Sequence, residues 1–180
     1  MAEPVEVKIV QSDNDARELD KLLWQTLWQP LGFPRDVRHQ FMIQGDEIEL
    51  CAKLNGRIVG GLIAVRTNDK ELELRHMAVA APFQRSGVGR SLVAELVRMA
   101  ASKDCTKIRT IARNTSTGFF RKMEFEKTQQ SAPEHPVFLK HGIRLEIMDR
   151  NVEPSTPGDA AKPRTFAVTF GTAEKKTFTS

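Results

Sequence analysis

The sequence predicts an α/β (α+β) fold, in which helices flank one central sheet. Short segments that alternate apolar and polar residues, as strands with one buried face do, are interleaved with amphipathic helical segments. A glycine-rich stretch, residues 84–89, lies where an apolar strand (72–79) gives way to a helix (88–102). With 180 residues, of which 40% are hydrophobic, the chain fits one domain with a sizeable core.

The chain begins with a predicted strand and helix. Residues 5–10 alternate like a strand with one buried face. Ser12 is expected to cap a helix that runs to about Trp28. The segment 31–43 that follows is predicted to be a loop or a short second helix. It either covers a substrate entrance or serves as a packing connector.

Three strands are predicted next, at 48–54, 57–66 and 71–79. The dipeptide Asn55-Gly56 joins the first two, and this pair is a strong signal for a tight hairpin turn. The three strands are therefore expected to run antiparallel to one another.

After the helix at 88–102, the remaining elements are predicted to be a strand at 107–112, a helix at 115–123, and strands at 125–129 and 144–149. From Asn151 onward the composition shifts to Pro, Thr, Ser, Gly and Lys. This shift predicts a domain over residues 1–150 and a C-terminal tail over residues 151–180. The tail is expected to be flexible, or to add its strand-like segment 165–170 to a sheet edge.

The glycine-rich stretch has the properties of a phosphate cradle. Glycines lack a Cβ, so backbone N–H groups can crowd around an anion. A helix that starts at the same place adds its unpaired N–H groups and the positive end of its dipole. An anionic ligand also accounts for the formal net charge of +4.

Composition argues against several other classes of protein. The basic residues are scattered, without the cluster expected of a nucleic-acid-binding arm. The two cysteines and the histidines His39, His135 and His141 show no metal-ligand spacing, which predicts no metal site and reduced thiols. No apolar run approaches the roughly 20 residues of a membrane span, and no signal peptide is recognisable. A cytoplasmic protein without nucleic-acid or membrane partners is expected.

Three segments, in order, resemble the Gcn5-related N-acetyltransferase (GNAT) superfamily and its small bacterial-type members. Residues 77–89 follow the family's pattern of a strand and then Gln/Arg-x-x-Gly-x-Gly. Residues 112–125 resemble its segment of an asparagine followed by an aromatic pair, and residues 138–148 are similar to the closing hairpin of some members. The resemblance, which runs from about residue 5 to 150, implies the GNAT fold. In that fold the central sheet is mixed but mostly antiparallel, and its fourth and fifth strands splay apart.

The resemblance also implies acetyl-CoA as co-substrate. The cradle would hold the pyrophosphate, and the pantetheine arm would lie along residues 77–79 like an added strand. The N–H of Val79 or its neighbour would face the thioester carbonyl and stabilise a developing oxyanion. The residues expected to bind the co-substrate are Met77, Ala78, Val79, Gln84, Arg85, Ser86, Gly87, Val88, Gly89, Arg90, Asn114, Phe119 and Phe120.

Attack on a thioester requires a neutral amine, whereas a free alkylamine with a pKa of about 10 is mostly protonated at neutral pH. Glu73 occupies the strand position of a glutamate base in the histone-modifying branch of the family, and the alternative is a solvated edge glutamate. It lies opposite in parity to Leu72 and Leu74. His76 is a second candidate base. Its parity matches that of the two leucines, which favours a partly buried histidine instead.

Two residues depart from the family's pattern. Phe120 stands where many members have a tyrosine that protonates the departing thiolate, and the chain contains no tyrosine. The thiolate then leaves without an acid, a hydroxyl such as that of Ser116 relays a proton, or transfer is inefficient. Glu124 stands where the family usually has a glycine, and a left-handed residue there would be mildly strained.

The expected function is that of an acyl-CoA-dependent N-acyltransferase. It would transfer an acetyl group from acetyl-CoA to a primary amine of a small molecule or peptide by direct attack. The alternative is a non-catalytic acyl-CoA-binding regulatory module, which the missing tyrosine favours. A homodimer is compatible with the resemblance, since dimers are frequent in similar proteins.

Overall fold

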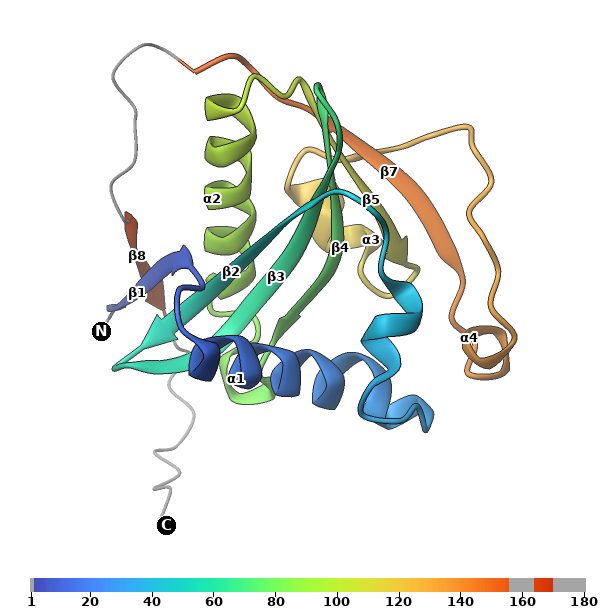
Figure 1. Ribbon diagram of the computed structural model, residues 1–180, viewed down its shortest axis with the longest axis horizontal. Helices are drawn as coiled ribbons and strands as arrows, with labels where there is room; N and C mark the ends of the chain where they lie inside the picture. The colour runs from blue at the N-terminus through green and yellow to red at the C-terminus, as the bar shows by residue number, and fades with distance from the viewer. Residues whose placement is uncertain (1, 156–163, 170–180) are drawn as a thin grey trace.

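A computed structural model describes residues 2–155 and 164–169 (Figure 1). Its strands are β1 (Ala2–Ile9), β2 (Asp46–Leu54), β3 (Arg57–Asn68), β4 (Glu71–Val79), β5 (Lys107–Arg113), β6 (Glu126–Lys127), β7 (Leu145–Asn151) and β8 (Arg164–Thr169). Its α-helices are α1 (Asp13–Leu23), α2 (Val88–Ser102), α3 (Thr117–Lys122) and α4 (Pro136–Lys140). A π-helical segment (η1, Trp24–Trp28) and three 3₁₀ turns complete the elements: η2 (Gln29–Leu31), η3 (Val37–Phe41) and η4 (Ala81–Phe83).

The described strands form one sheet in the order β6-β7-β5-β4-β3-β2-β1-β8. Neighbouring strands are antiparallel except β4 and β5, which are parallel, so the predicted mixed and mostly antiparallel sheet is confirmed. β4 and β5 pair only from Glu71 and Lys107 to Leu74 and Thr110. Beyond this point β4 continues along β3 and β5 continues along β7, and Figure 1 shows their ends diverging. The predicted splay between these two strands is confirmed.

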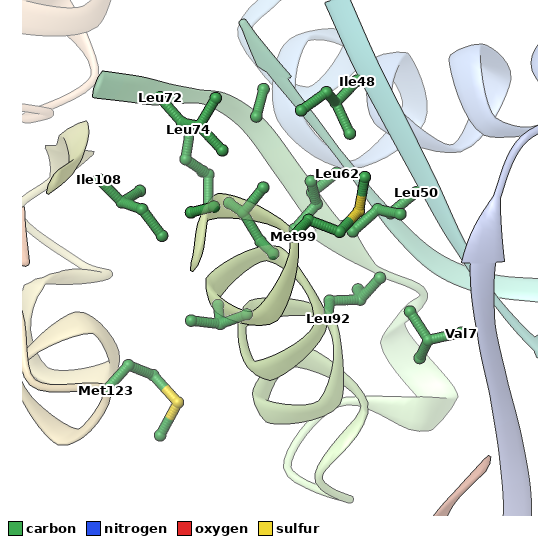
Figure 2. Packing of buried hydrophobic residues seen from close by; sticks show 14 of the residues in the cluster. Val7, Ile48, Leu50, Leu62, Leu72, Leu74, Leu92, Met99, Ile108 and Met123 are labelled. Carbon is green, nitrogen blue, oxygen red and sulfur yellow. The ribbon is translucent and has the colours of Figure 1, made fainter. Parts of the chain in front are cut away.

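The hydrophobic core has one cluster on each face of the sheet. The larger cluster lies under α2, where Figure 2 shows Leu92 and Met99 turned toward Leu50 and Leu62 of the sheet. The smaller cluster lies under α1 and η1 and includes Ile63 and Ala78. Burial of one large apolar side chain contributes about 1.5–3 kcal/mol, so both helices are held mainly by this packing.

The N-terminal helix follows the prediction. The Ser12 hydroxyl accepts a hydrogen bond from the Asp15 amide at 3.1 Å, and the helical path continues as η1 to Trp28. The next segment forms the 3₁₀ turns η2 and η3. Arg38 of η3 forms ion pairs with carboxylates of α1 and β2, which are Asp20, Glu47 and Glu49.

The hairpin predicted at Asn55-Gly56 is confirmed. These two residues connect β2 to β3, and their φ angles of 49° and 77° are the positive values that this tight turn requires. Asparagine and glycine are the residues that adopt such angles with least strain.

The hairpin expected over residues 138–148 is wrong in its first half. Residues 136–140 form helix α4, and the strand β7 begins only at Leu145. His135 caps this helix, since its Nδ1 accepts the Val137 amide at 3.2 Å. Pro136 occupies the first turn, where its missing N–H costs nothing. The strand predicted at 125–129 is also shorter, because only Glu126 and Lys127 pair with β7.

Strand β8 pairs antiparallel with β1 and forms the edge of the sheet. It falls within the predicted tail, at the segment expected to extend a sheet edge. Residues 156–163 and 170–180, the rest of the stretch predicted to be flexible, lie outside the described residues.

A β-bulge in β4 corrects the predicted orientation of His76. His76 is paired with Ile63, and Leu74 with the next residue, Ala64, so Arg75 is an extra residue on β4. A bulge of this kind reverses the alternation of side chains. His76 therefore shares the α1 face with Ile63, and the prediction that it shares a face with Leu74 is wrong.

Glu124 has the left-handed conformation considered from the sequence, with a φ of 66°. It follows the end of α3, where glycine would adopt this angle without strain. The exposed carboxylate pairs with Arg150 at 2.8 Å. Its place is at a helix end and apart from the cavity described below.

Candidate active site

A cavity of about 1130 Å³ occupies the gap where β4 and β5 diverge. One wall is formed by the ends of these two strands, and a second by the glycine-rich stretch and α3. The third wall comes from η1, η3 and the segment around α4. The cavity thus joins the glycine-rich stretch to an aromatic region beside Arg75 and His76 of β4.

The glycine-rich stretch forms a row of backbone donors at the start of α2. Arg85 and Gly87 have φ angles of 60° and 99°, and Gly87 is the N-cap of the helix. Within the described part of the chain, the amides of residues 85–90 have no hydrogen-bond partner. The first amide of α2 that is paired is that of Ser91, which donates to the Gly87 carbonyl at 3.0 Å. Unpaired amides at a helix N-terminus form an anion-binding site.

The side chains of this stretch alternate between the cavity and the core. Arg85 and Arg90 line the cavity and are exposed, and neither has a carboxylate partner among the described residues. The Ser86 hydroxyl donates to the Phe83 carbonyl, and Val88 is buried in the larger core cluster. Of the residues predicted to bind the co-substrate here, Ser86 and Val88 can therefore offer only their backbone.

The end of β4 presents its backbone to the gap. Ala80 donates to the Val59 carbonyl of β3 at 2.9 Å. Because the hydrogen-bonding direction alternates along an antiparallel strand, the preceding residue, Val79, directs its N–H and C=O away from β3. Met77 has the same orientation, two residues earlier. The Val79 carbonyl accepts a hydrogen bond from the Gln84 side chain at 2.9 Å. The Val79 N–H therefore points away from β3 and toward the cavity, which this residue lines.

Thr110 closes the gap at its narrow end. Its buried hydroxyl donates to the Leu74 carbonyl at 3.1 Å, at the last residue pair that β4 and β5 share. A side chain thus satisfies a backbone acceptor at the point where the two strands separate.

Replacing Thr110 with valine is expected to lower the free energy of unfolding by about 1–3 kcal/mol, because valine keeps the shape but offers no donor in a buried position. Thr110→Ser, which keeps the hydroxyl, is the matched control. Urea denaturation measures both variants. Equal stability of the two would contradict the role assigned to the hydroxyl.

Glu73 does not line the cavity. It lies on the α1 face, and its carboxylate pairs with Nη1 of Arg75 at 2.5 Å. Arg75 also donates to the Phe41 carbonyl at 2.7 Å. The carboxylate proposed from the sequence as a base is thus tied to the bulge arginine beside the cavity.

His76 lines the cavity and packs edge-on against Trp28, with 4.8 Å between ring centroids. Burial lowers its pKa to about 3, with further contributions from the neighbouring charges of Arg75, Arg38 and Arg113. The imidazole is therefore neutral at pH 7. It can accept a hydrogen bond but holds a proton weakly.

The protein is expected to become less stable as the pH is lowered, because of His76. Its pKa is about 3 in the folded protein and about 6.5 in the unfolded chain, so the unfolded chain takes up the proton first as the pH falls. Unfolding becomes easier from about pH 6.5 downward, by on the order of 2 kcal/mol at about pH 4.5. Urea denaturation at about pH 7 and pH 4.5 should show a smaller loss for His76→Gln. The same loss in both proteins would contradict this expectation.

The aromatic pair of α3, which was predicted to contact the co-substrate, lies beside the cradle. A Cβ placed on Gly89 would lie 3.2 Å from the Phe119 ring, so this ring packs directly on the glycine. Phe120 also borders the cavity, and it packs edge-on against Phe119 and Phe125. A larger residue at position 89 would need the Phe119 ring to shift by a few tenths of an ångström.

The structure does not bring the Asn114 side chain to the cavity. Its Oδ1 accepts the Arg144 amide at 3.2 Å, and its Nδ2 donates to the Gly142 carbonyl at 3.4 Å. Asn114 thus fixes the start of β7 and is absent from the cavity wall. The prediction that it bonds the pantetheine arm is not supported by this placement.

The cavity also has an aromatic region beside His76, of which the sequence indicated only the segment 31–43. Trp28 stacks on Phe41 with 6.2 Å between ring centroids, and Phe41 stacks on Phe138 at 6.2 Å. His135 packs against Phe138 at 5.1 Å. These rings come from η1, η3 and α4, and no local sequence pattern links segments so far apart.

Arg113 of β5 borders the same region. Its Nη2 donates to the Leu27 carbonyl at 2.6 Å, and its guanidinium lies 5.1 Å from the centre of the Phe138 ring. Burial lowers its pKa. The alternation of β5 puts Arg113 on the α1 face, which was a signal available in the sequence.

Other kinds of site are not found in the described chain. Among residues 2–155 and 164–169, no group of three or more His, Cys, Asp or Glu side chains could hold a metal ion. No helix in these ranges has the length and apolar character needed to cross a membrane. Cys51 and Cys105 are free and buried, and neither lines the cavity.

A family model described as the acetyltransferase (GNAT) family matches residues 14–125. A search of curated proteins found no match.

Solved structures of acetyltransferases have the same fold. The ribosomal-protein-S18-alanine N-acetyltransferase from Escherichia coli matches with a TM-score of 0.67 and 14% identity, over 86% of this chain and 97% of that one. An aminoglycoside 6'-N-acetyltransferase complexed with coenzyme A gives 0.66 and 14%, over 83% and 98% of the two chains. A GNAT family acetyltransferase from Elizabethkingia anophelis with acetyl-CoA bound gives 0.56 and 18%, over 83% and 97%. At these identities the likeness concerns the fold alone.

Proposed function

The chain belongs to the acetyltransferase (GNAT) family, and from this premise we propose that it transfers an acetyl group from acetyl-CoA to a primary amine. The acceptor would be a small molecule or a peptide. The observation that carries the proposal is one continuous cavity that joins a row of unpaired amides to the gap between β4 and β5. An anion held at one end would place a group attached to it in that gap.

The residues present fit acetyl-CoA. The free amides of residues 85–90, with Arg85 and Arg90, would hold the pyrophosphate. The open edge of β4, from Met77 to Val79, would hold the pantetheine arm through backbone hydrogen bonds. Two of the structural relatives are described as holding coenzyme A or acetyl-CoA, which supports the same assignment.

When bound, acetyl-CoA supplies an acetyl group activated as a thioester. The Val79 amide is the donor on the β4 edge that would face the thioester carbonyl oxygen. Neutral His76 would accept a hydrogen bond from the acceptor amine and orient its lone pair. Glu73 acts through Arg75 in this arrangement, because its carboxylate is paired there.

The surroundings of His76 would also prepare the acceptor. Burial, the main cause of the low pKa of His76, would lower the pKa of an amine beside it as well. A larger fraction of the amine would then be neutral at pH 7, as nucleophilic attack requires. With Phe120 in the position of the usual tyrosine, the departing thiolate would take its proton from water.

Calorimetry with acetyl-CoA, together with thiol release measured over a panel of amines, tests the proposal. Binding with thiol release for at least one amine is the expected result. Binding without thiol release for any amine would favour a regulatory acyl-CoA-binding module, and absence of binding would exclude both functions. Glu73→Gln should leave the pH dependence of turnover unchanged, whereas a loss confined to low pH would identify Glu73 as the base.

A further inference from the structure

Of the arginines near His76, Arg113 is the one whose charge no carboxylate of the described residues balances. Arg38 pairs with three carboxylates, and Arg75 pairs with Glu73. Arg113, in contrast, has no ion-pair partner among residues 2–155 and 164–169. A guanidinium removed from bulk water without an anion is unfavourable, so an anionic partner from outside the chain would stabilise it.

The guanidinium has donors left for such a partner. Its one hydrogen bond within the described chain, from Nη2 to the Leu27 carbonyl, uses one of five N–H groups. No hydrogen bond within the described residues occupies the remaining nitrogens of Arg113, and its side chain is only half-buried. Arg113 lines the cavity, so these donors open onto it.

The co-substrate does not account for this charge. Its phosphates would be held at the cradle by Arg85 and Arg90, beside Phe119 of α3. Arg113 instead lies against η1 and α4, through Leu27 and Phe138. An anion at Arg113 would therefore belong to a second molecule that enters from the aromatic end.

The surroundings of Arg113 define the rest of that molecule. The side chains of Trp28, Phe41 and Phe138 form a nearly continuous aromatic wall beside it. Glu134 is the one acidic residue that the described part of the chain contributes to the cavity wall, and it is exposed. An acceptor with several positive charges would be repelled there, because the wall carries arginines and a single carboxylate.

We infer that the acceptor is a small amine that also carries a carboxylate and an apolar, preferably aromatic, body. The carboxylate pairs with Arg113, the body packs on the wall of Trp28, Phe41 and Phe138, and the amine faces His76. This inference rests on the proposed function. Arg113 is then a specificity-determining residue, because it holds the acceptor and not the reacting atoms.

Binding can be tested without any reaction, in protein saturated with CoA. The probes are 3-phenylpropanoate and 3-phenylpropanamide, which share one body and differ in the carboxylate, titrated by calorimetry. The carboxylate is expected to bind at least about tenfold more tightly, as a charge-assisted hydrogen bond implies. Arg113→Gln should abolish this preference, Arg113→Lys should keep part of it, and Arg144→Gln, which removes an exposed arginine outside the cavity, should keep all of it.

Turnover, measured as thiol release, provides a second test. L-phenylalanine is expected to release thiol with a lower KM than 2-phenylethylamine, and Arg113→Gln should raise only the KM for phenylalanine, with kcat nearly constant. Equal binding of the two probes, no binding of either, or a preference that survives in Arg113→Gln would overturn the inference. Because the first two comparisons use the unaltered protein, misfolding of a variant cannot obscure them. Failure of acetyl-CoA binding, measured separately, would instead count against the proposed function.

Discussion

Gly87→Asp is expected to weaken acetyl-CoA binding by at least about 100-fold. Gly87 is the N-cap of α2, and a carboxylate at an N-cap accepts the amides that the cradle would otherwise offer to the pyrophosphate. It also repels the phosphates. At a separation of about 5 Å and an effective dielectric constant of about 20, two unit charges repel by about 3 kcal/mol.

Gly87→Asn is the matched control, because asparagine has nearly the same size as aspartate and meets the same backbone strain at the observed φ of 99°. A Cβ at this position meets only Val168, at 3.8 Å, so neither variant is excluded by crowding. Calorimetry with acetyl-CoA should show a much smaller loss for the asparagine variant. If both variants bound acetyl-CoA as the unaltered protein does, residues 84–90 would not be the phosphate site.

Gly61→Ala is expected to lower the free energy of unfolding by about 3 kcal/mol. A Cβ on Gly61 would lie 2.2 Å from Leu19 Cδ1 and 2.7 Å from the Leu50 carbonyl oxygen. Leu19 is 1% exposed in the cluster under α1, so it has no free space to move into. Overpacking of this kind strains both the helix and the sheet.

Gly118→Ala provides the comparison for the same chemical change. Gly118 lies in α3 with nothing within 4 Å of its would-be Cβ, and alanine in a helix is favoured over glycine. This variant should be more stable by about 0.5–1 kcal/mol. Thermal or urea unfolding of both variants would decide, and a Gly61→Ala protein as stable as Gly118→Ala would refute the close packing of α1 on β3.

Much of the fold could be predicted because its signals are local. The turn at Asn55-Gly56 needs two residues with positive φ, and the dipeptide supplies them. The cradle likewise depends on a glycine at a strand-to-helix junction, where Gly87 takes its left-handed angle. In both places a few adjacent residues determine the backbone.

The orientation of His76 could not be predicted because it depends on pairing. The extra residue Arg75 is recognisable only when β4 is aligned with β3, since nothing in the sequence of β4 marks a bulge. Glu73 precedes the bulge, so the simple alternation of side chains still holds there and its face was predicted correctly.

The residues of the cradle could be grouped from the sequence, whereas the residues around Arg113 could not. The cradle and Phe119 lie in continuous motifs, whereas Arg113, Phe41 and Phe138 meet only through the tertiary fold. Asn114 shows that a motif can be recognised without the contacts of its side chains being known. Its position in the motif was recognised, but the turn before β7 uses both atoms of its side-chain amide.

The short pairing between β4 and β5 makes the sheet two half-sheets joined by a narrow seam. One half is β6-β7-β5 and the other is β4-β3-β2-β1-β8, and the seam spans four residue pairs. A ligand bound in the gap would contact both halves and make hydrogen bonds that the two strands do not make to each other. Separating the halves would then also cost the binding free energy, so the protein with ligand bound should have a higher free energy of unfolding than the protein without it.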